Sequence, residues 1–303
     1  MKMRFMSIAV SLLAVMVVMI GNVASAVESP VGVKHVILIG WDGYGSEYVN
    51  WDEVPNLKKM KENGAWSLKK RSVLPSVSAI NWCTMLMGAG SEIHGYRNWG
   101  SVKPEIPSAV LTERGRFPDI FYLVHTQMPE AETAATYTWD ACTAFIDSEK
   151  VTYKQWIDHK YDELTVKLIE FLGHNPVLSF TYYSEPDIIG HGKGWGTDEY
   201  HKTVQDLDKY LGDVLKFLEE NDRMNDTLVI VTSDHGGHDK RHGTDTLVDM
   251  NTPIVFYGAG VKPGEISDVI VNYDTAATIA WVLGLEPPQA WRGQAIKSAF
   301  QVK

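Results

Sequence analysis

A short apolar run decides the fold of this chain: HVILIG, at residues 35–40, which is followed at once by Trp41-Asp42-Gly43. A run of this length that is rich in β-branched residues and ends in a turn signal predicts a buried central strand. Runs of the same kind recur farther along the chain: TAATYTW at 133–139, VLSFTYY at 177–183, TLVIVT at 227–232 and TPIVFYG at 252–258.

Two long segments between these runs have the pattern of helices. Residues 153–173 and 197–221 repeat apolar residues at intervals of three and four, as helices that pack on one face do. The second begins with Thr197 as its predicted N-cap. Strands that alternate with amphipathic helices predict an α/β fold with a mainly parallel central sheet and helices on both faces. Because no linker, repeat or low-complexity stretch interrupts the pattern, we expect a single domain.

The N-terminus has the features of an export signal. Lys2 and Arg4 precede an apolar run at residues 5–20, and Ala24-Ser25-Ala26 offers a signal peptidase site. We therefore predict a cleaved signal peptide at 1–26, a catalytic domain at 27–303, and a periplasmic or secreted protein without a stable membrane span. An uncleaved anchor helix is the alternative, which the short apolar run disfavours.

Charge and cysteine content exclude several classes of function. The formal net charge is −10, which argues against a broad nucleic-acid-binding surface. Only two cysteines occur, Cys83 and Cys142, so the chain is neither a disulfide scaffold nor a thiolate metal site. Export would permit a bridge between them, and two buried thiols are equally compatible with the sequence.

Acidic residues follow three of the predicted strands. Asp42 follows the first, Asp187 with His191 follows 177–183, and Asp234 with His235 follows 227–232. Each acid alone could be a turn residue or a helix cap. Because ligands of open α/β sheets bind beyond the carboxyl ends of the strands, three acids at matching positions, two of them with histidine, indicate metal ligands instead.

A candidate nucleophile lies in SVLPSVSAIN, residues 72–81. A helical pattern begins near Ala79, with Ser78 at its predicted N-cap. A serine there could act on a phosphate bound at the helix N-terminus, and Asn81 could donate its amide to the same anion. Serine needs a base or a metal to become nucleophilic, and the chain has no G-x-S-x-G elbow. A metal-activated serine is therefore the favoured interpretation, and a plain N-cap is the structural alternative.

Taken together, Asp42, Ser78 with Asn81, DIIGH at 187–191 and SDHGG with a later His-Gly resemble the alkaline phosphatase superfamily. Within it the chain is most similar to the type I phosphodiesterase/nucleotide pyrophosphatase branch. The resemblance implies an alkaline phosphatase-like fold and two zinc ions about 4 Å apart. It implies one zinc held by Asp42, Ser78, Asp234 and His235, and another held by Asp187, His191 and His242. Manganese or iron could replace zinc in such a set.

The same resemblance implies the reaction. It is that of an exported two-metal phosphoester hydrolase, most of all a phosphodiesterase, that acts on a small phosphate ester through a phosphoseryl intermediate. His238 competes with His242 as the seventh ligand. The branch usually has threonine followed by Phe-Pro-Asn, whereas this chain has Ser78-Ala79-Ile80-Asn81, which alters the surroundings of the nucleophile.

Other functions remain open at this level. A phosphomonoesterase would need a further cation, for which Arg71 and Arg97 are candidates. The remaining alternatives are a phosphonate or sulfate-ester hydrolase and a metal-binding module without activity. Ser78 lacks the following x-Pro-x-Arg from which sulfatases make their formylglycine. Substrate and oligomeric state are not encoded in any motif.

Overall fold

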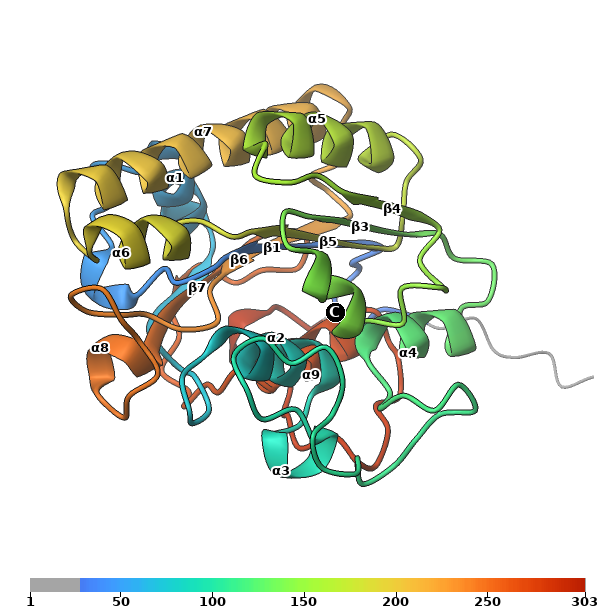
Figure 1. The fold of residues 1–303 in the computed structure, drawn as a ribbon. Helices are drawn as coiled ribbons and strands as arrows, with labels where there is room; N and C mark the ends of the chain where they lie inside the picture. Colours follow the sequence, from blue (N-terminus) through green and yellow to red (C-terminus); the bar gives the residue numbers. More distant parts are fainter. Residues whose placement is uncertain (1–27, 303) are drawn as a thin grey trace, which may run out of the picture.

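The computed structural model describes residues 28–302, which form one sheet in the strand order β4-β3-β5-β1-β6-β7-β2-β8 (Figure 1). The strands are β1 (His35–Trp41), β2 (Ala65–Arg71), β3 (Thr133–Tyr137), β4 (Tyr153–Trp156), β5 (Leu178–Tyr183), β6 (Thr227–Thr232), β7 (Asn251–Gly258) and β8 (Gly264–Glu265). All five predicted strands are therefore present, although β3 ends two residues earlier than expected.

The central strand β1 sets the direction of the sheet. It pairs in parallel with β5 on one side and with β6 on the other. Beyond β5, strands β3 and β4 continue the parallel part. On the other side β7 runs antiparallel to both β6 and β2, and β8 is parallel to β2. The prediction of a mainly parallel sheet is confirmed, with β7 as the strand that makes it mixed.

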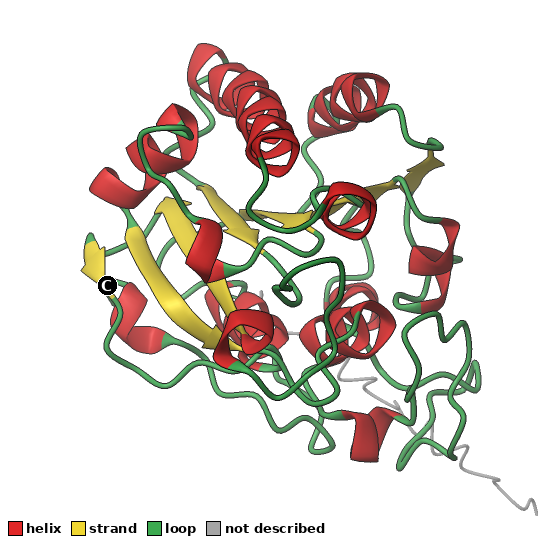
Figure 2. Ribbon diagram, turned by 60° about the vertical axis from the view of Figure 1, so that its left-hand side comes forward, coloured by secondary structure: helices red, strands yellow, loops and turns green. Residues whose placement is uncertain are grey.

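Successive residues of β1 point to opposite faces of the sheet. Val36 and Leu38 belong to one buried apolar cluster, and Ile37 and Ile39 belong to another. Helices cover both faces, as predicted (Figures 1 and 2). The first cluster includes side chains from α2 (Ser78–Met87), α4 (Ile120–Gln127) and α9 (Asp274–Val282), and the second from α1 (Pro55–Asn63), α5 (Tyr161–Leu172) and α7 (Asp198–Glu220).

Shorter helical pieces lie in the connections. They are α3 (Ser91–His94), α6 (Asp187–Lys193), α8 (Leu247–Met250), and the 3-10 turns η1 (Ser46–Tyr48), η2 (Asp140–Ala144) and η3 (Lys297–Ala299).

The helix predicted over 153–173 is wrong at its beginning. Tyr153–Trp156 is strand β4, and the helix begins only at Tyr161. The reason is tertiary, because β3 offers unpaired backbone groups and pairing with them overrides the local pattern. The other long helix is confirmed, since the hydroxyl of Thr197 accepts a hydrogen bond from the amide of Tyr200 and caps α7.

The predicted signal peptide lies outside the described residues. Within residues 28–302, no helix has the length and apolarity that a bilayer crossing needs. Cys83 and Cys142 are both buried as free thiols.

Candidate active site and metal centre

The three acids predicted from the strand ends come together at one edge of the sheet. Asp42 directly follows β1, Asp234 follows β6, and Asp187 begins α6 after β5. The amide of Asp187 donates to the carbonyl of Asp42 at 2.9 Å, and the amide of Gly43 donates to Oδ1 of Asp234 at 3.2 Å. Gly43 has φ +72°, and a Cβ there would lie 2.8 Å from Cβ of Asp187. Glycine is therefore required where these strands meet.

Ser78 and His235 complete a first group with two of these acids. Oγ of Ser78 lies 3.1 Å from Nε2 of His235. The same Nε2 lies 3.5 Å from Oδ1 of Asp42 and 3.3 Å from Oδ2 of Asp234. All four side chains are buried. The four residues expected around one metal ion are thus adjacent in space.

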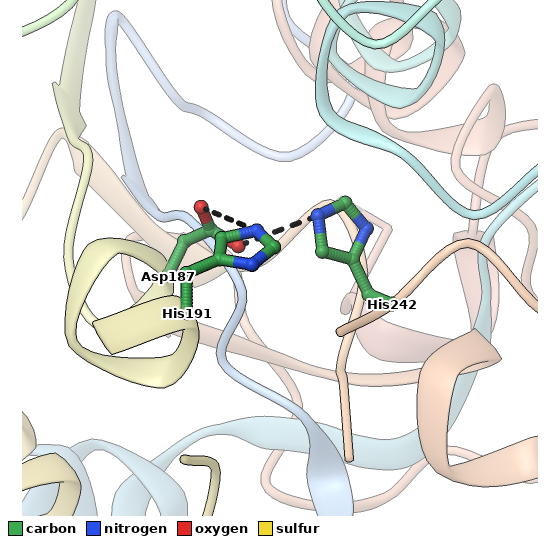
Figure 3. A group of neighbouring side chains, drawn as sticks. All are labelled: Asp187, His191 and His242. Atoms are coloured by element: carbon green, nitrogen blue, oxygen red, sulfur yellow. Dashed lines mark ion pairs between the residues drawn. The ribbon is translucent and has the colours of Figure 1, made fainter. Parts of the chain in front are cut away.

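A second group surrounds Asp187 (Figure 3). Nε2 of His191 lies 3.6 Å from Oδ2 of Asp187, and Nε2 of His242 lies 3.7 Å from Oδ1. The ligand atoms of this trio lie within 4.8 Å of one another, and Asp187 forms such a group with Asp42 and His235 too. The rings of His235 and His242 stack with centroids 3.8 Å apart. The two groups are therefore contiguous.

Each of the three histidines points its Nδ1 at a backbone carbonyl. Nδ1 of His235 lies 2.8 Å from the carbonyl of Gly236, Nδ1 of His242 lies 2.9 Å from that of Ser76, and Nδ1 of His191 lies 3.1 Å from that of Lys240. A carbonyl can only accept, so Nδ1 carries the proton in each ring and Nε2 presents a lone pair to the carboxylates. Metal-binding histidines are commonly oriented in this way.

The Asp and His side chains of the two groups have the charge and the free ligand atoms that bound metal ions require. Oδ1 of Asp42, Oδ1 of Asp187 and Oδ2 of Asp234 are buried without a hydrogen-bond partner. Burial raises the pKa of all three acids, and for Asp187 and Asp234 the neighbouring carboxylates raise it further. Burial also lowers the pKa of His235 to about 4 and that of His242 to about 3. Lone pairs and carboxylates that converge without a cation repel, and divalent metal ions would relieve this repulsion.

Two further side chains hold Asp42, and the sequence did not reveal this role. Nε1 of Trp82 donates to Oδ2 of Asp42 at 3.0 Å, and Oη of Tyr182 donates to the same oxygen at 2.5 Å. Oδ1 is thereby left to face His235. A Cβ at Gly40 would lie 2.3 Å from the Trp82 ring, so this glycine makes room for it. Nothing in the local sequence of Trp82 or Tyr182 could indicate the contact, because it depends on how α2 packs on the sheet.

Ser78 occupies a slightly different position in its helix from the one predicted. Val77 has the extended backbone of the N-cap, so Ser78 is the first residue of α2. The amide of Ala79 already donates to the carbonyl of Trp99 at 2.9 Å. The start of α2 therefore has one fewer free donor for an anion than the prediction assumed.

Asn81 does not have the predicted role of an anion donor. Its Nδ2 donates to the carbonyls of Val73 and Pro75 at 3.2 Å and of Val77 at 3.1 Å. Its Oδ1 accepts from the amide of Val73 and from Asn272. The side chain is fully buried and holds the loop that precedes Ser78, which corrects the sequence-based assignment to the catalytic groups.

His242, and not His238, lies beside Asp187. Nδ1 of His238 is bonded to Oδ1 of Asp249 at 2.7 Å, and its Nε2 accepts from Nε of Arg241 at 3.2 Å. Asp249 is fully buried and also accepts from the amide and hydroxyl of Thr244. His238 therefore stabilises the loop and is not free to bind a metal. The buried carboxylate of Asp249 therefore holds His238 and Thr244 together in this loop.

A cavity of about 640 Å³ opens over both groups. Of the aromatic residues near the motifs, Trp99 lines it, whereas Trp41, Tyr44 and Trp82 are wholly buried. The lining consists of Asp42, Val77, Ser78, Trp99, Thr138, Trp139, Asp140, Trp156, Asp158, His159, Tyr182, Ser184, Asp187, Ile188, His191 and His242.

An α/β sheet with these Asp, His and Ser residues at its carboxyl edge is the arrangement that the resemblance to the alkaline phosphatase superfamily implied. The chain belongs to the type I phosphodiesterase/nucleotide pyrophosphatase family, whose sequence profile matches residues 36–289.

Named relatives agree with this assignment. The venom phosphodiesterase CdcPDE of Crotalus durissus collilineatus is 26% identical over 70% of this chain and 28% of its own length. Ectonucleotide pyrophosphatase/phosphodiesterase family member 1 of Mus musculus is 24% identical over 84% of this chain and 30% of its own. The chain thus spans less than a third of the length of these relatives.

Solved structures show the shared fold. Murine ectonucleotide pyrophosphatase/phosphodiesterase 5, in an inactive form in complex with AMP, matches with a TM-score of 0.71 at 15% identity over 88% of this chain and all of that one. Ps i-CgsB in complex with k-i-k-neocarrahexaose matches with a TM-score of 0.68 at 15% identity over 88% and 76%. Because these two proteins bind such different ligands, the shared fold does not identify the substrate.

Proposed function

We propose that this chain is an exported two-metal phosphodiesterase that uses Ser78 as its nucleophile. One observation carries the proposal: Oγ of Ser78 lies 3.1 Å from Nε2 of His235, in a group with two buried carboxylates, each of which has one oxygen without a hydrogen-bond partner. Export is supported by the sequence pattern at residues 1–26 and by the prefix "ecto" in the name of a relative.

The Asp and His residues would hold two zinc ions. Asp42, Asp234 and His235 would hold one near Ser78, and Asp187, His191 and His242 would hold the other. When bound, zinc lowers the pKa of a hydroxyl group and neutralises charge on the reacting oxygens.

The side chains of the protein perform the remaining steps. Oγ of Ser78 attacks phosphorus while the bond to the leaving oxygen breaks, and the proton of the hydroxyl group is balanced by the one that the leaving alcohol gains. The phosphoryl group, still esterified to the second alcohol, is then held by the serine as the phosphoseryl intermediate. Water breaks the bond between phosphorus and Oγ, which restores the hydroxyl group and releases a phosphate monoester. Trp82 and Tyr182 hold Asp42 in place, and the backbone carbonyls at Nδ1 fix the histidine rings. These contacts orient the site before substrate arrives.

The lining of the cavity favours a diester over a monoester. None of its residues is a lysine or an arginine, and neither Arg71 nor Arg97 belongs to it. A monoester dianion would gain from such a cation, whereas a diester carries one charge and needs room for a second substituent. The volume of about 640 Å³ provides that room.

Rates on three aryl esters test the proposal. We expect the zinc-loaded protein to hydrolyse bis(4-nitrophenyl) phosphate at least about tenfold faster, in kcat/KM, than 4-nitrophenyl phosphate, and to leave 4-nitrophenyl sulfate nearly untouched; tenfold corresponds to about 1.4 kcal/mol. A chelator should abolish the activity and added zinc should restore it. Stoichiometric metal without hydrolysis of any ester would instead identify a metal-binding module, and a preference for the sulfate would identify a sulfate-ester hydrolase.

A further inference from the structure

Lys70 is the only lysine or arginine among residues 28–302 that is wholly buried. It lies on β2, a strand that delivers no predicted ligand to the active site. Its Nζ donates to two neutral oxygens, the carbonyl of Ser233 at 2.7 Å and Oδ1 of Asn272. Burial lowers the pKa of Lys70 to about 7, because neither partner is a carboxylate that would repay the loss of water. A buried lysine of this kind is costly, so a reason for its presence is required.

A β-bulge turns Lys70 into the protein. Ala65 and Ser67 are buried, and strict alternation along β2 would bury residue 69 as the next in this series. The register between β2 and β7 shifts between Ser67 and Lys70. Lys69 is therefore exposed, and Lys70 is buried in its place. Bulges beside active sites commonly re-aim a side chain in this way.

Lys70 holds the backbone on which two predicted metal ligands stand. Ser233, whose carbonyl it binds, directly precedes Asp234 and His235. Lysine can only donate, so Oδ1 of Asn272 must face Nζ and the Nδ2 group must face the other way. Nδ2 then donates to the carbonyl of Asp234 at 2.9 Å. Two successive carbonyls are thus held by one buried lysine, directly at the first and through Asn272 at the second.

We propose that Lys70 is a positioning residue, which fixes the backbone at residues 233–235 so that Asp234 and His235 are already oriented when the metal ion near Ser78 binds. The inference rests on the proposed function, because that ion belongs to it. Groups that orient metal ligands from behind typically change metal affinity ten- to a hundredfold when they are removed. Lys70 and Asn272 contact no ligand of the second predicted ion, so the effect should be confined to the first.

Zinc affinity can be measured at each metal separately. His242→Ala removes a ligand of the second ion and isolates the first, whereas His235→Ala removes a ligand of the first and isolates the second. Lys70→Met keeps a side chain of similar length without its donors. In the His242→Ala background it should weaken zinc binding at least about tenfold in competition with a chromogenic chelator. In the His235→Ala background the change should stay below about twofold.

Two controls separate this effect from a loss of stability. Lys69→Met changes the neighbouring lysine, whose side chain is 81% exposed, and should leave both zinc affinities unchanged. Thr165→Val removes a buried hydroxyl that is bonded to Tyr183 at 2.7 Å on the other face of the sheet. It should lower the free energy of unfolding without favouring one metal over the other. A purely structural role of Lys70 would give the pattern of Thr165→Val.

Turnover links the zinc affinity to the reaction. For bis(4-nitrophenyl) phosphate, the free zinc concentration that gives half-maximal kcat should rise about tenfold in Lys70→Met. KM should change little, because Lys70 does not line the cavity. Asn272→Leu should have a similar effect. The double variant should lose much less than the sum of the two single losses, since both residues act on the same backbone.

The outcomes separate the two proposals. If the wild type binds zinc and hydrolyses no ester, the proposed function fails, while the two affinities still decide the inference. If it binds no zinc, amide hydrogen exchange of the metal-free protein decides instead, and Lys70→Met should raise exchange at residues 231–237 about fivefold over Lys69→Met. Unchanged exchange there, unchanged affinity for the first ion, or equal weakening of both ions would overturn the inference.

Discussion

Oγ of Ser78 lies 3.1 Å from Nε2 of His235, although the two residues are 157 positions apart in the chain. The contact resembles half of a serine–histidine–acid triad. The other half is absent from the described site, because Nδ1 of His235 faces the carbonyl of Gly236 and not a carboxylate. Two carboxylates lie beside Nε2 instead. This geometry favours activation of the serine by a metal ion.

Removal of the Ser78 hydroxyl tests its role as the nucleophile. Ser78→Ala should lower kcat/KM for bis(4-nitrophenyl) phosphate roughly a thousandfold or more, with zinc content nearly unchanged. The matched control is Thr84→Val on the same helix, whose hydroxyl is bonded to buried His94 at 3.1 Å and not to the site. It should lose a little stability and retain most of the activity. Substantial turnover by Ser78→Ala would exclude this serine as the nucleophile.

The choice between His242 and His238 can be tested by metal content. His242→Ala should lower bound zinc from two ions towards one per chain, because Asp187 and His191 alone leave the second group incomplete. His238→Gln should keep both ions, since His238 is bonded to Asp249 and Arg241. Elemental analysis of the two purified variants checks this. The reverse pattern would reassign the seventh ligand.

Tyr182 and Tyr183 are neighbours on β5 that serve opposite faces of the sheet. Tyr182→Phe removes one of the two donors to Oδ2 of Asp42 and should lower zinc affinity about tenfold. Tyr183→Phe removes a hydroxyl bonded to Thr165 at 2.7 Å, in the other apolar cluster, and should leave zinc affinity unchanged. Competition with a chromogenic chelator measures both affinities. Equal behaviour of the two variants would show that the bond to Asp42 does not tune the metal site.

Substitution of Asn81 should reduce the stability of the protein, and it should affect catalysis only through that loss. Asn81→Ala leaves the amide of Val73 without its acceptor and removes one of the two acceptors of Asn272 Nδ2, which should lower the free energy of unfolding by roughly 2–4 kcal/mol. Urea denaturation measures this change. A variant of normal stability whose kcat alone has fallen would restore the original prediction that Asn81 contacts the phosphoryl group.

Asp119, which is not one of the proposed metal ligands, should make the stability of the protein depend on pH. Oδ1 accepts from the amides of Phe121 and Tyr122 and caps α4, while Oδ2 is buried without a partner. Burial raises the pKa of Asp119 to about 7. Between about pH 4 and pH 7 the unfolded chain has therefore lost a proton that the folded chain keeps, so stability falls as pH rises through this window.

Asp119→Asn isolates that effect, because asparagine caps helices equally well and does not titrate. The difference in unfolding free energy between wild type and variant should change by about 1.4 kcal/mol for every pH unit inside the window. It should be flat above about pH 7. A difference that stays constant from pH 4 to pH 8 would show that Asp119 is ionised throughout in the folded protein.

Within the described part of the chain, the sequence by itself determined the layered α/β fold and the set of candidate ligands. Both follow from short-range patterns, because alternation of apolar runs with amphipathic segments fixes the layers, and parallel strands must end at one edge. Asp42, Asp187 and Asp234 could therefore be placed together before any coordinates were known. The same reasoning failed at β4, whose backbone pairs with β3 from another part of the chain.

Only the tertiary structure decided which partner each polar group has. It decided that His242 and not His238 faces Asp187, that Asn81 holds a loop, and that two donors contact Asp42. All three depend on distances between elements far apart in sequence. A hydrogen bond or a metal contact requires positions accurate to a few tenths of an ångström, whereas a pattern of residues specifies only the face and the end of an element. The part of the cavity lining that Trp139, Asp140, Trp156 and Asp158 form also depends on the tertiary structure, because β3 and β4 are neighbours in the sheet.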